Sequence, residues 1–404
     1  MNSIKVLTVA SNFPDIYYPT IAPWSKKQVD AVHKYTDVVV EVVAPRPYTI
    51  PFSVFPYNKF SKLPIHTISD TGYNLHFPRF PYLIPKKIFF SVTGDLYSLF
   101  ISKYILNNIK KPDLLHARFT YLDGYGILKI RKKWDIPLVV DIHGSVEFKE
   151  YYFSTLLGKK QRKTIKSANK ILCVAQWQVK KGLELGIPEE KLKCIPMGVD
   201  INKFKPRDKE KIRQDFEIPE QKIILFVGQL NKEKGVNYLL EAISQVVSKS
   251  DYIKDVRVII IGDGPEKENL INLTKRLGIM NIVTFAGQVI GELLFKWYSL
   301  ADLFVLPSLT EGRPSVINEA MASECAIVAT NIGGIPEQVK DGYNGFLVEP
   351  KNVDMLVEKI IYLLDNENEM IRMGKNGRIR IIEEDWTWEG YAKRARSIYS
   401  EVIK

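Results

Sequence analysis

Short apolar runs alternate with longer helical segments along the entire chain. In Gly235–Ser248, for example, apolar residues recur at the spacing of one helix face. The short runs are continuously apolar, which is typical of strands buried on both faces of a parallel sheet. The pattern therefore predicts an α/β protein with two doubly wound sheets, one in each half of the chain. Strands are expected at Ile4–Ala10, Asp37–Val43, Asp113–His116, Pro137–Asp141 and Lys170–Val174, and then at Ile223–Val227, Val256–Ile261, Val283–Ala286, Leu303–Leu306, Ala326–Ala329 and Gly345–Val348.

A segment rich in glycine, proline and short polar residues, Pro196–Pro206, marks the boundary between the two halves. We expect a Rossmann-like N-terminal domain at residues 1–200 and a second Rossmann-like domain at residues 201–382. Residues 383–404 form a last helical segment. Its aromatic stripe, which begins at Trp386, is expected to pack back onto the first domain.

The composition is that of an ordinary globular protein, because 46% of the 404 residues are hydrophobic and 25% are charged. The three cysteines stand singly, without a CxxC pair, and are expected to be buried thiols in a reducing compartment. The chain does not open with a basic segment followed by an apolar one. No apolar run reaches the ~18 residues that a membrane span needs. We therefore expect a cytoplasmic protein.

The net charge of +11 is concentrated in the first half of the chain. Residues 1–200 contain 29 Lys and Arg against 16 Asp and Glu, whereas the remaining 204 residues contain 28 against 30. This asymmetry predicts an anionic partner: a phosphorylated lipid, an anionic membrane or a nucleic acid. No nucleic-acid-binding module is recognisable, which disfavours nucleic acid. Two segments, His76–Phe90 and Lys149–Lys163, combine aromatic and basic residues and favour peripheral contact with the inner face of a membrane.

Two carboxylates stand beside a predicted helix start in the second half. The strand Leu303–Leu306 ends in a Pro-Ser loop, Glu311 follows, a helix is expected after Pro314, and Glu319 lies on that helix. Ligands of open α/β sheets bind at the carboxyl ends of the strands. Carboxylates can accept hydrogen bonds from sugar hydroxyls, and the first three amides after Pro314 are expected to be free to hold a phosphate. The layout predicts a sugar-nucleotide site.

Two glycine-containing turns of the same domain support this interpretation. Gly228 ends one strand and is followed by Lys234, which can reach a diphosphate as a point charge. Gly262 ends the next strand, and Pro265 is expected at the first position of the helix that follows.

The first domain carries its own candidates at the ends of its strands. Tyr18 lies in an aromatic and proline-rich loop after the first strand, His116 ends a later strand, and His143 lies at the end of another. A histidine at the carboxyl end of a strand is placed to donate a hydrogen bond to a sugar or to accept a proton.

Together these motifs resemble the retaining glycosyltransferases of GT-B fold in which two glutamates are separated by seven residues, known as glycosyltransferase group 1. The resemblance is strongest from Ile223 to Pro350, and Pro196–Phe204 also matches the segment between the family's domains. It implies two Rossmann-like domains facing a central cleft, with a C-terminal helix that returns to the first domain.

The resemblance also implies an activity and a set of roles. The activity is transfer of a hexose from a UDP- or GDP-sugar to an acceptor hydroxyl with retention of configuration, in polysaccharide or glycolipid synthesis. The acceptor would be a growing or lipid-linked glycan. No metal or other cofactor is expected. The implied catalytic residues are His143, Glu311 and Lys234; the donor-binding residues are Gly228, Gln229, Lys234, Gly262, Glu311, Gly312, Pro314, Ser315, Val316 and Glu319; and the acceptor-side residues are Tyr18, His116, Arg118 and His143.

The chain departs from the family pattern at two places that bear on the site. Gln229 stands where the family usually has arginine, so one cation for the diphosphate is missing. The loop at Tyr18 lacks the usual Gly-Gly pair. Two alternatives stay open from sequence: a sugar-nucleotide 2-epimerase of GT-B type, which needs no acceptor, and a non-catalytic subunit that binds a sugar nucleotide.

Overall fold

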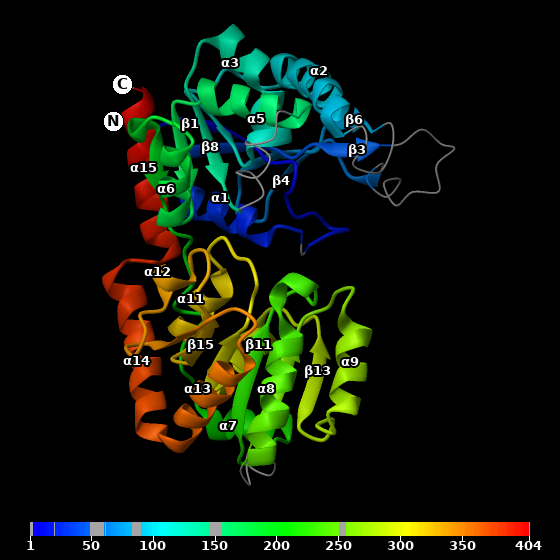
Figure 1. The fold of residues 1–404 in the computed structure, drawn as a ribbon. Helices are drawn as coiled ribbons and strands as arrows, with labels where there is room; N and C mark the ends of the chain where they lie inside the picture. Colours follow the sequence, from blue (N-terminus) through cyan, green and yellow to red (C-terminus); the bar gives the residue numbers. More distant parts are fainter. Residues whose placement is uncertain are drawn as a thin grey trace. The chain divides into compact units, whose positions relative to one another are not determined.

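The computed structural model describes residues 3–19, 21–48, 60, 62–82, 90–144, 155–249 and 256–403. The chain forms two compact units (Figure 1). Unit 1 comprises Met1–Met197 together with Trp388–Lys404, and unit 2 comprises Gly198–Thr387. The division falls within a few residues of the predicted boundary at residue 200. The last helix belongs to unit 1 although it follows unit 2 in sequence.

Unit 1 is built on an eight-stranded sheet in the order β10-β9-β8-β7-β1-β2-β5-β4. Neighbouring strands are parallel except for β4, which runs antiparallel to β5 at the edge. A small parallel pair, β3 and β6, stands apart from it. The strands are β1 (Lys5–Val9), β2 (Val39–Val43), β3 (Arg46–Tyr48), β4 (His66–Ile68), β5 (Asn74–His76), β6 (Arg79–Pro81), β7 (Leu114–Ala117), β8 (Leu138–Ile142), β9 (Lys170–Cys173) and β10 (Leu192–Cys194). The α-helices are α1 (Pro23–Tyr35), α2 (Phe90–Asn108), α3 (Leu128–Trp134), α5 (Leu156–Ser167), α6 (Gln176–Glu184) and α15 (Trp388–Ile403).

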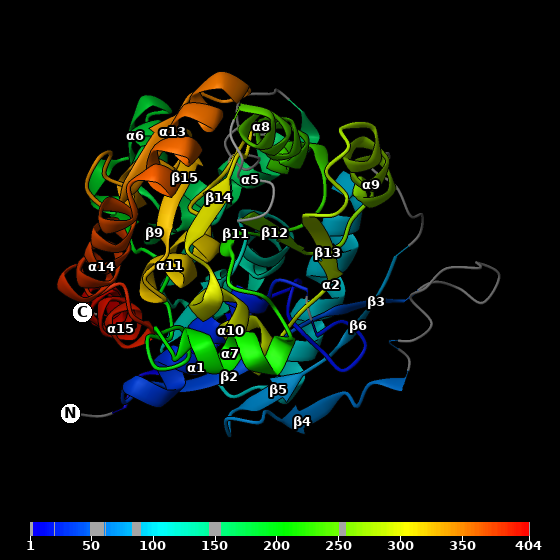
Figure 2. The same ribbon diagram turned by 90° about the horizontal axis from the view of Figure 1, so that it is seen from below.

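Unit 2 is built on a six-stranded, fully parallel sheet in the order β13-β12-β11-β14-β15-β16. The helices α8, α9 and α13 cover one face, and α10 and α11 lie on the other (Figure 2). The strands are β11 (Lys222–Val227), β12 (Val256–Ile261), β13 (Val283–Gly287), β14 (Leu303–Leu306), β15 (Ala326–Thr330) and β16 (Gly345–Val348). The helices are α7 (Lys209–Phe216), α8 (Val236–Lys249), α9 (Lys267–Arg276), α10 (Glu292–Leu300), α11 (Ser315–Ala322), α12 (Ile335–Gln338), α13 (Val353–Asp365) and α14 (Glu367–Glu383).

All eleven predicted strands are confirmed, with ends that shift by at most two residues. The pattern missed the short strands β3 to β6, because three residues are too few to establish a periodicity. The prediction for Pro265 was wrong, since α9 begins only at Lys267 and Pro265 lies in the turn before it. Among the described residues, no helix has the length and apolar composition needed to cross a lipid bilayer.

The prediction for Trp386 was also wrong. Its ring belongs to the hydrophobic core of unit 2, where the guanidinium of Arg313 lies 4.2 Å from the ring centroid and that of Arg380 lies 5.2 Å away. A flat guanidinium packs favourably on an indole face, and this contact keeps Trp386 in unit 2. The helix that packs on unit 1 begins two positions later, at Trp388.

A buried polar cluster ties α15 to the sheet of unit 1. His116 lies on β7; its Nε2 is 2.7 Å from Asp141 Oδ1, and its Nδ1 is 2.8 Å from the hydroxyl of Tyr399 on α15. Arg118 Nη1 donates to Asp141 Oδ2 at 2.5 Å and to the hydroxyl of Tyr391, also on α15, at 3.4 Å. Burial lowers the pKa of His116, so the imidazole is neutral, with Nε2–H donating to Asp141 and Nδ1 accepting from Tyr399.

The cluster is balanced in charge. Burial alone would raise the pKa of the Asp141 carboxyl, but His116 and Arg118 beside it hold that pKa well below its usual range. Asp141 is therefore a carboxylate paired with the Arg118 guanidinium. Both His116 and Arg118, which the resemblance assigned to the acceptor side, are almost completely buried. Their polar atoms hold the last helix in place.

Replacing Arg118 with methionine should destabilise unit 1 severely, because Asp141 would keep a buried charge without its partner. A loss of about 3–5 kcal/mol in the free energy of unfolding is expected from chemical denaturation. The control is Arg396→Ala, which removes a solvent-exposed pair between α15 and Asp37 at 2.9 Å and should leave stability nearly unchanged. Equal effects of the two substitutions would contradict the cluster's role.

Candidate active site

The carboxyl ends of β11 and β14 form the switch point of the sheet in unit 2. The chain runs from β11 outward to β13, then returns to β14 on the other side of β11, so the loops after these two strands diverge. Lys234 comes from the first loop and Glu311 from the second. Lys234 Nζ lies 2.6 Å from Glu311 Oε1. The side chain of Glu311 is 8% exposed and that of Lys234 is 23% exposed, so the pair is largely shielded from water.

Ser308, in the Pro-Ser loop, donates its hydroxyl to Glu311 Oε1 at 2.7 Å. The carbonyl of Ser308 in turn accepts a hydrogen bond from Thr330 Oγ1 at 2.7 Å. These contacts fix the orientation of the Glu311 carboxylate. The sequence did not identify Ser308, although its position directly after a strand was a usable signal.

Glycines allow the loops of this site to approach one another. Gly262 has φ +145°, and a Cβ there would lie 1.8 Å from the carbonyl oxygen of Gly228. Gly333 has φ +52°, and its Cβ would lie 2.1 Å from the carbonyl oxygen of Glu311. Any side chain would push these backbones apart. The glycine-rich turns therefore set the position of Gly228 and of the Glu311 loop.

Helix α11 starts beside this pair. Its N-cap residue, Pro314, is extended, and no side chain caps the helix. The prediction that the first three amides are free was wrong for the third, because the N–H of Ile317 donates to the carbonyl of Pro314 at 3.3 Å. Ser315 and Val316 supply the first amides of the helix. The helix contains no carbonyl one turn earlier that could accept hydrogen bonds from them. The start of α11 therefore combines the positive end of the helix dipole with N–H groups.

Glu319 lies one turn farther along α11 and is buried. Its Oε2 accepts a hydrogen bond at 3.0 Å from the hydroxyl of Tyr298, on α10. Burial, with the nearby Glu319 charge, raises the pKa of Tyr298 well above its usual value, so Tyr298 remains a donor. Sequence reasoning missed Tyr298, which lies among other aromatic residues on α10.

Gln229 takes part in the loop that presents Lys234. Its Oε1 accepts from Asn231 Nδ2 at 3.3 Å, and Asn231 Oδ1 accepts from the backbone N–H of Lys234 at 3.2 Å. The exposed Gln229 side chain carries no charge. Of the predicted donor-side residues, the structure brings Lys234 and Glu311 together four residues before the start of α11. Gly228 and Gly262 pack against each other at the ends of β11 and β12.

In unit 1, three of the four acceptor-side candidates gather around Asp141. His143 follows β8, and its Nε2 lies 3.6 Å from the Asp141 Oδ2 that also binds Arg118. The His143 ring is flanked by the rings of Phe119 and Trp24, at centroid distances of 5.3 and 6.4 Å. His143 therefore lies next to the same carboxylate that anchors α15.

Tyr18 lies on a separate loop after β1. Its ring packs on Phe60 at a centroid distance of 5.4 Å. The loop is held by Asp15, whose Oδ1 accepts from the backbone N–H of Tyr18 at 3.0 Å and whose Oδ2 pairs with Arg46 at 2.8 Å.

The same loop is fixed at its start by Asp123. Asp123 Oδ1 accepts from the backbone N–H of Ser11 at 2.8 Å and from the hydroxyl of Tyr97 at 3.0 Å. The side chain is completely buried, and this burial raises its pKa to about 7. Sequence reasoning missed Asp123 because it lies in a short π-helical turn, Thr120–Gly124, that has no recognisable pattern.

Among the described residues, no group of three or more His, Cys, Asp or Glu side chains is arranged to hold a metal ion. The groups available to a ligand at the switch point of unit 2 are one lysine, two carboxylates, hydroxyls and helix amides.

Comparison with known proteins gives the family. A model of glycosyl transferases group 1 matches residues 208–380, and a model of glycosyltransferase family 4 matches residues 37–203. A D-inositol 3-phosphate glycosyltransferase of Corynebacterium diphtheriae is 30% identical over 314 residues, covering 72% of this chain and 70% of that protein. TuaC of Bacillus subtilis, named for teichuronic acid biosynthesis, is 27% identical over 363 residues, or 88% of each chain.

Solved structures give the same fold. Sucrose-phosphate synthase of Thermosynechococcus elongatus superimposes with a TM-score of 0.81 at 20% identity, over 99% of both chains. Anabaena HepE, in complex with UDP and glucose, superimposes with a TM-score of 0.73 at 21% identity, over 98% of this chain and 99% of HepE. The fold is GT-B. The chain belongs to the group 1 glycosyltransferases.

The raised pKa of Asp123 should appear as a pH dependence of stability. The folded state keeps this proton up to about pH 7, whereas the unfolded chain releases it near 3.8, the ordinary pKa of an aspartate. The bound proton therefore adds to the free energy of unfolding at low pH, and this stabilisation is lost as the pH rises through 7. Between about pH 5 and pH 8, wild type should lose about 2–3 kcal/mol of unfolding free energy relative to Asp123→Asn.

Urea denaturation of both proteins across that pH range measures the difference. Asparagine is the matched control because it keeps the size of the side chain and an acceptor for Ser11 but does not titrate. Parallel pH profiles would show that Asp123 is ionised in the folded protein at neutral pH.

Proposed function

We propose that this glycosyltransferase moves a hexose from a UDP- or GDP-sugar to a hydroxyl of a growing or lipid-linked glycan, with retention of anomeric configuration. The observation that carries the proposal is the 2.6 Å pair of Lys234 and Glu311 at the switch point, beside the uncapped start of α11. A cation and helix amides suit a diphosphate, and a carboxylate suits sugar hydroxyls. The complexes of HepE with UDP and with UDP-glucose support the same class of donor.

In this proposal the ion pair keeps the empty site neutral. The donor diphosphate takes over Lys234 and occupies the start of α11. Glu311, held by Ser308, is then released from its cation and accepts hydrogen bonds from hydroxyls of the donor sugar. Glu319 receives the ribose. Because Gln229 supplies no charge, Lys234 and the helix start carry most of the binding of the diphosphate.

The transfer exchanges one C–O bond for another. The acceptor oxygen bonds to the anomeric carbon on the face from which the diphosphate leaves. The bond to the leaving oxygen breaks with its electron pair, and the acceptor proton passes to the departing phosphate. Lys234 and the α11 amides stabilise the charge that develops there. No metal is needed for this step in our proposal, so EDTA should leave turnover unchanged. His143 is proposed to donate a hydrogen bond on the acceptor side.

We also propose that unit 1 rests peripherally on an anionic membrane. Of the two segments singled out by sequence, residues 83–89 and 149–154 lie outside the described residues. The neighbouring α2 exposes Val92, Leu99 and Phe100. Helices α3 and α5 pack against α2 and present the exposed lysines Lys129, Lys132, Lys133, Lys159 and Lys163. Exposed apolar side chains beside lysines are typical of an interfacial surface.

Removing either member of the ion pair should abolish transfer while preserving the fold. Lys234→Ala and Glu311→Ala are each expected to lower kcat/KM by about 100-fold or more, because each removes a group that contacts the donor. The assay follows sugar transfer from the UDP-, GDP- or ADP-sugar that raises the melting temperature in a thermal-shift panel. NMR of the product's anomeric centre tests retention.

The control is Lys296→Ala, which breaks a surface pair with Asp215 at 2.7 Å and should behave as wild type. Near-wild-type transfer by both site variants would overturn the assignment of the donor site. A product with inverted anomeric configuration would overturn the retaining mechanism. Conversion of the sugar nucleotide in the absence of an acceptor would favour the alternative function of a 2-epimerase.

Membrane binding is tested with the double variant Leu99→Asp, Phe100→Asp. It should sediment far less than wild type with vesicles that contain anionic lipid, and wild type should bind those vesicles less as salt rises. Ile382→Asp on α14 is the matched control, since Ile382 is 54% exposed and Leu99 is 55% exposed. Equal sedimentation of all three proteins would contradict the proposed surface.

A further inference from the structure

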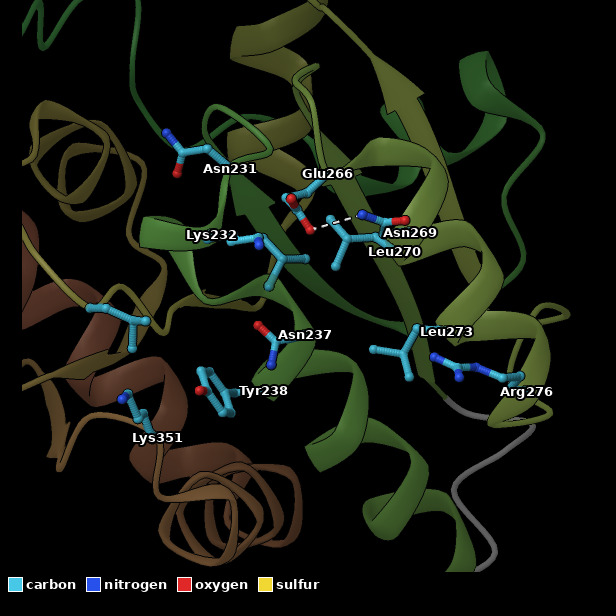
Figure 3. A pocket seen from close by; sticks show the side chains of 12 residues that line it. Asn231, Lys232, Asn237, Tyr238, Glu266, Asn269, Leu270, Leu273, Arg276 and Lys351 are labelled. Carbon is cyan, nitrogen blue, oxygen red and sulfur yellow. Dashed lines mark hydrogen bonds between the residues drawn. The ribbon is translucent and has the colours of Figure 1, made fainter.

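Unit 2 contains a second cavity, separate from the Lys234–Glu311 site. It has a volume of about 420 Å³ and lies between the start of α8 and the exposed side of α9 (Figure 3). Pockets for small ligands commonly have volumes of about 300–1,000 Å³, so it can hold a molecule of sugar size. None of Lys234, Glu311 and Glu319 lines it.

One short turn separates the two sites. Residues Lys232–Lys234 form a 3₁₀ turn between β11 and α8. Positions two apart on such a turn point in different directions, because three residues complete the circle. Lys234 accordingly pairs with Glu311, whereas Lys232 lines the second cavity.

The cavity carries an excess of positive charge. Lys232, Arg276 and Lys351 line it, against a single carboxylate, Glu266, which accepts a hydrogen bond from Asn269 at 3.1 Å. Within the described part of the chain, none of the three cations forms an ion pair. Three positive charges against one negative charge, without internal partners, favour an anionic ligand.

The remaining lining favours a sugar. Figure 3 shows Lys351 and Arg276 on opposite sides of the cavity, with Asn237 and Tyr238 between them. An amide and a phenol can exchange hydrogen bonds with sugar hydroxyls, and the phenol ring offers an apolar face. Cations at both ends suit acidic groups on the sugar.

We propose that this cavity binds an anionic saccharide, either a sugar phosphate or an acidic oligosaccharide, independently of the sugar-nucleotide donor. The inference does not rest on the proposed donor chemistry, because it uses different side chains on the other side of the turn at residues 232–234.

Isothermal titration calorimetry tests the proposal with full-length protein kept saturated with UDP and GDP together, so that donor-site binding cannot contribute. Glucose 6-phosphate and trigalacturonate represent the two sources of the ligand, and maltotriose is the neutral comparison. Either acidic probe should bind, more weakly as salt rises, whereas maltotriose should not. Binding of only one acidic probe identifies the source.

Arg276→Glu and Lys351→Glu should each weaken that binding by about tenfold or more. Lys275→Glu is the matched control, because Lys275 precedes Arg276 on α9, makes the same charge change and does not line the cavity. Melting temperatures verify that the variants fold. Absence of binding by both acidic probes, equal binding of maltotriose, or equal losses in Arg276→Glu and Lys275→Glu would overturn the proposal.

Discussion

Parallel strands impose the constraint on which both units depend. Each strand must be joined to the next by a crossover on one face of the sheet, and crossovers of this kind are right-handed. When the chain reverses its direction of winding, as it does between β13 and β14, the loops on either side of the reversal diverge. The diverging loops leave room for a ligand at the carboxyl ends of the strands on either side of the reversal. In unit 2 that place receives Lys234 from one side and Glu311 from the other.

Close contacts between backbone segments fix the positions of the loops in this site. The loops that carry the charged residues do not stand free, because Gly262 touches Gly228 and Gly333 touches Glu311. Hydrogen bonds from Ser308 and Tyr298 then fix the two carboxylates. The site is thus preorganised by neutral residues around a small number of charges. This arrangement limits the reorganisation that a bound diphosphate would require.

In unit 1 a single carboxylate, that of Asp141, both anchors the last helix and lies beside His143. Asp141 neutralises Arg118, accepts from His116 and lies close to His143. Because Tyr391 and Tyr399 complete the cluster, the end of the chain contributes to the surroundings of a strand end more than two hundred residues earlier. From sequence, His116 and Arg118 at the end of a strand suggested a ligand contact. In the structure both side chains are buried, and their hydrogen bonds to Tyr399 and Tyr391 anchor a helix.

The sequence by itself determined the sheets. Continuous apolar runs such as Val256–Ile261 and Leu303–Leu306 can be buried only in a covered parallel sheet, so strand positions and fold class followed from local pattern. It also located Lys234, Glu311 and the start of α11 in the connections that follow two strands of the second sheet. Tertiary structure alone decided which of these groups meet, that Trp386 stays in unit 2, and that His116 and Arg118 are buried. Those outcomes depend on contacts between residues far apart in the chain, and a local pattern carries no information about which distant partner will neutralise a buried charge.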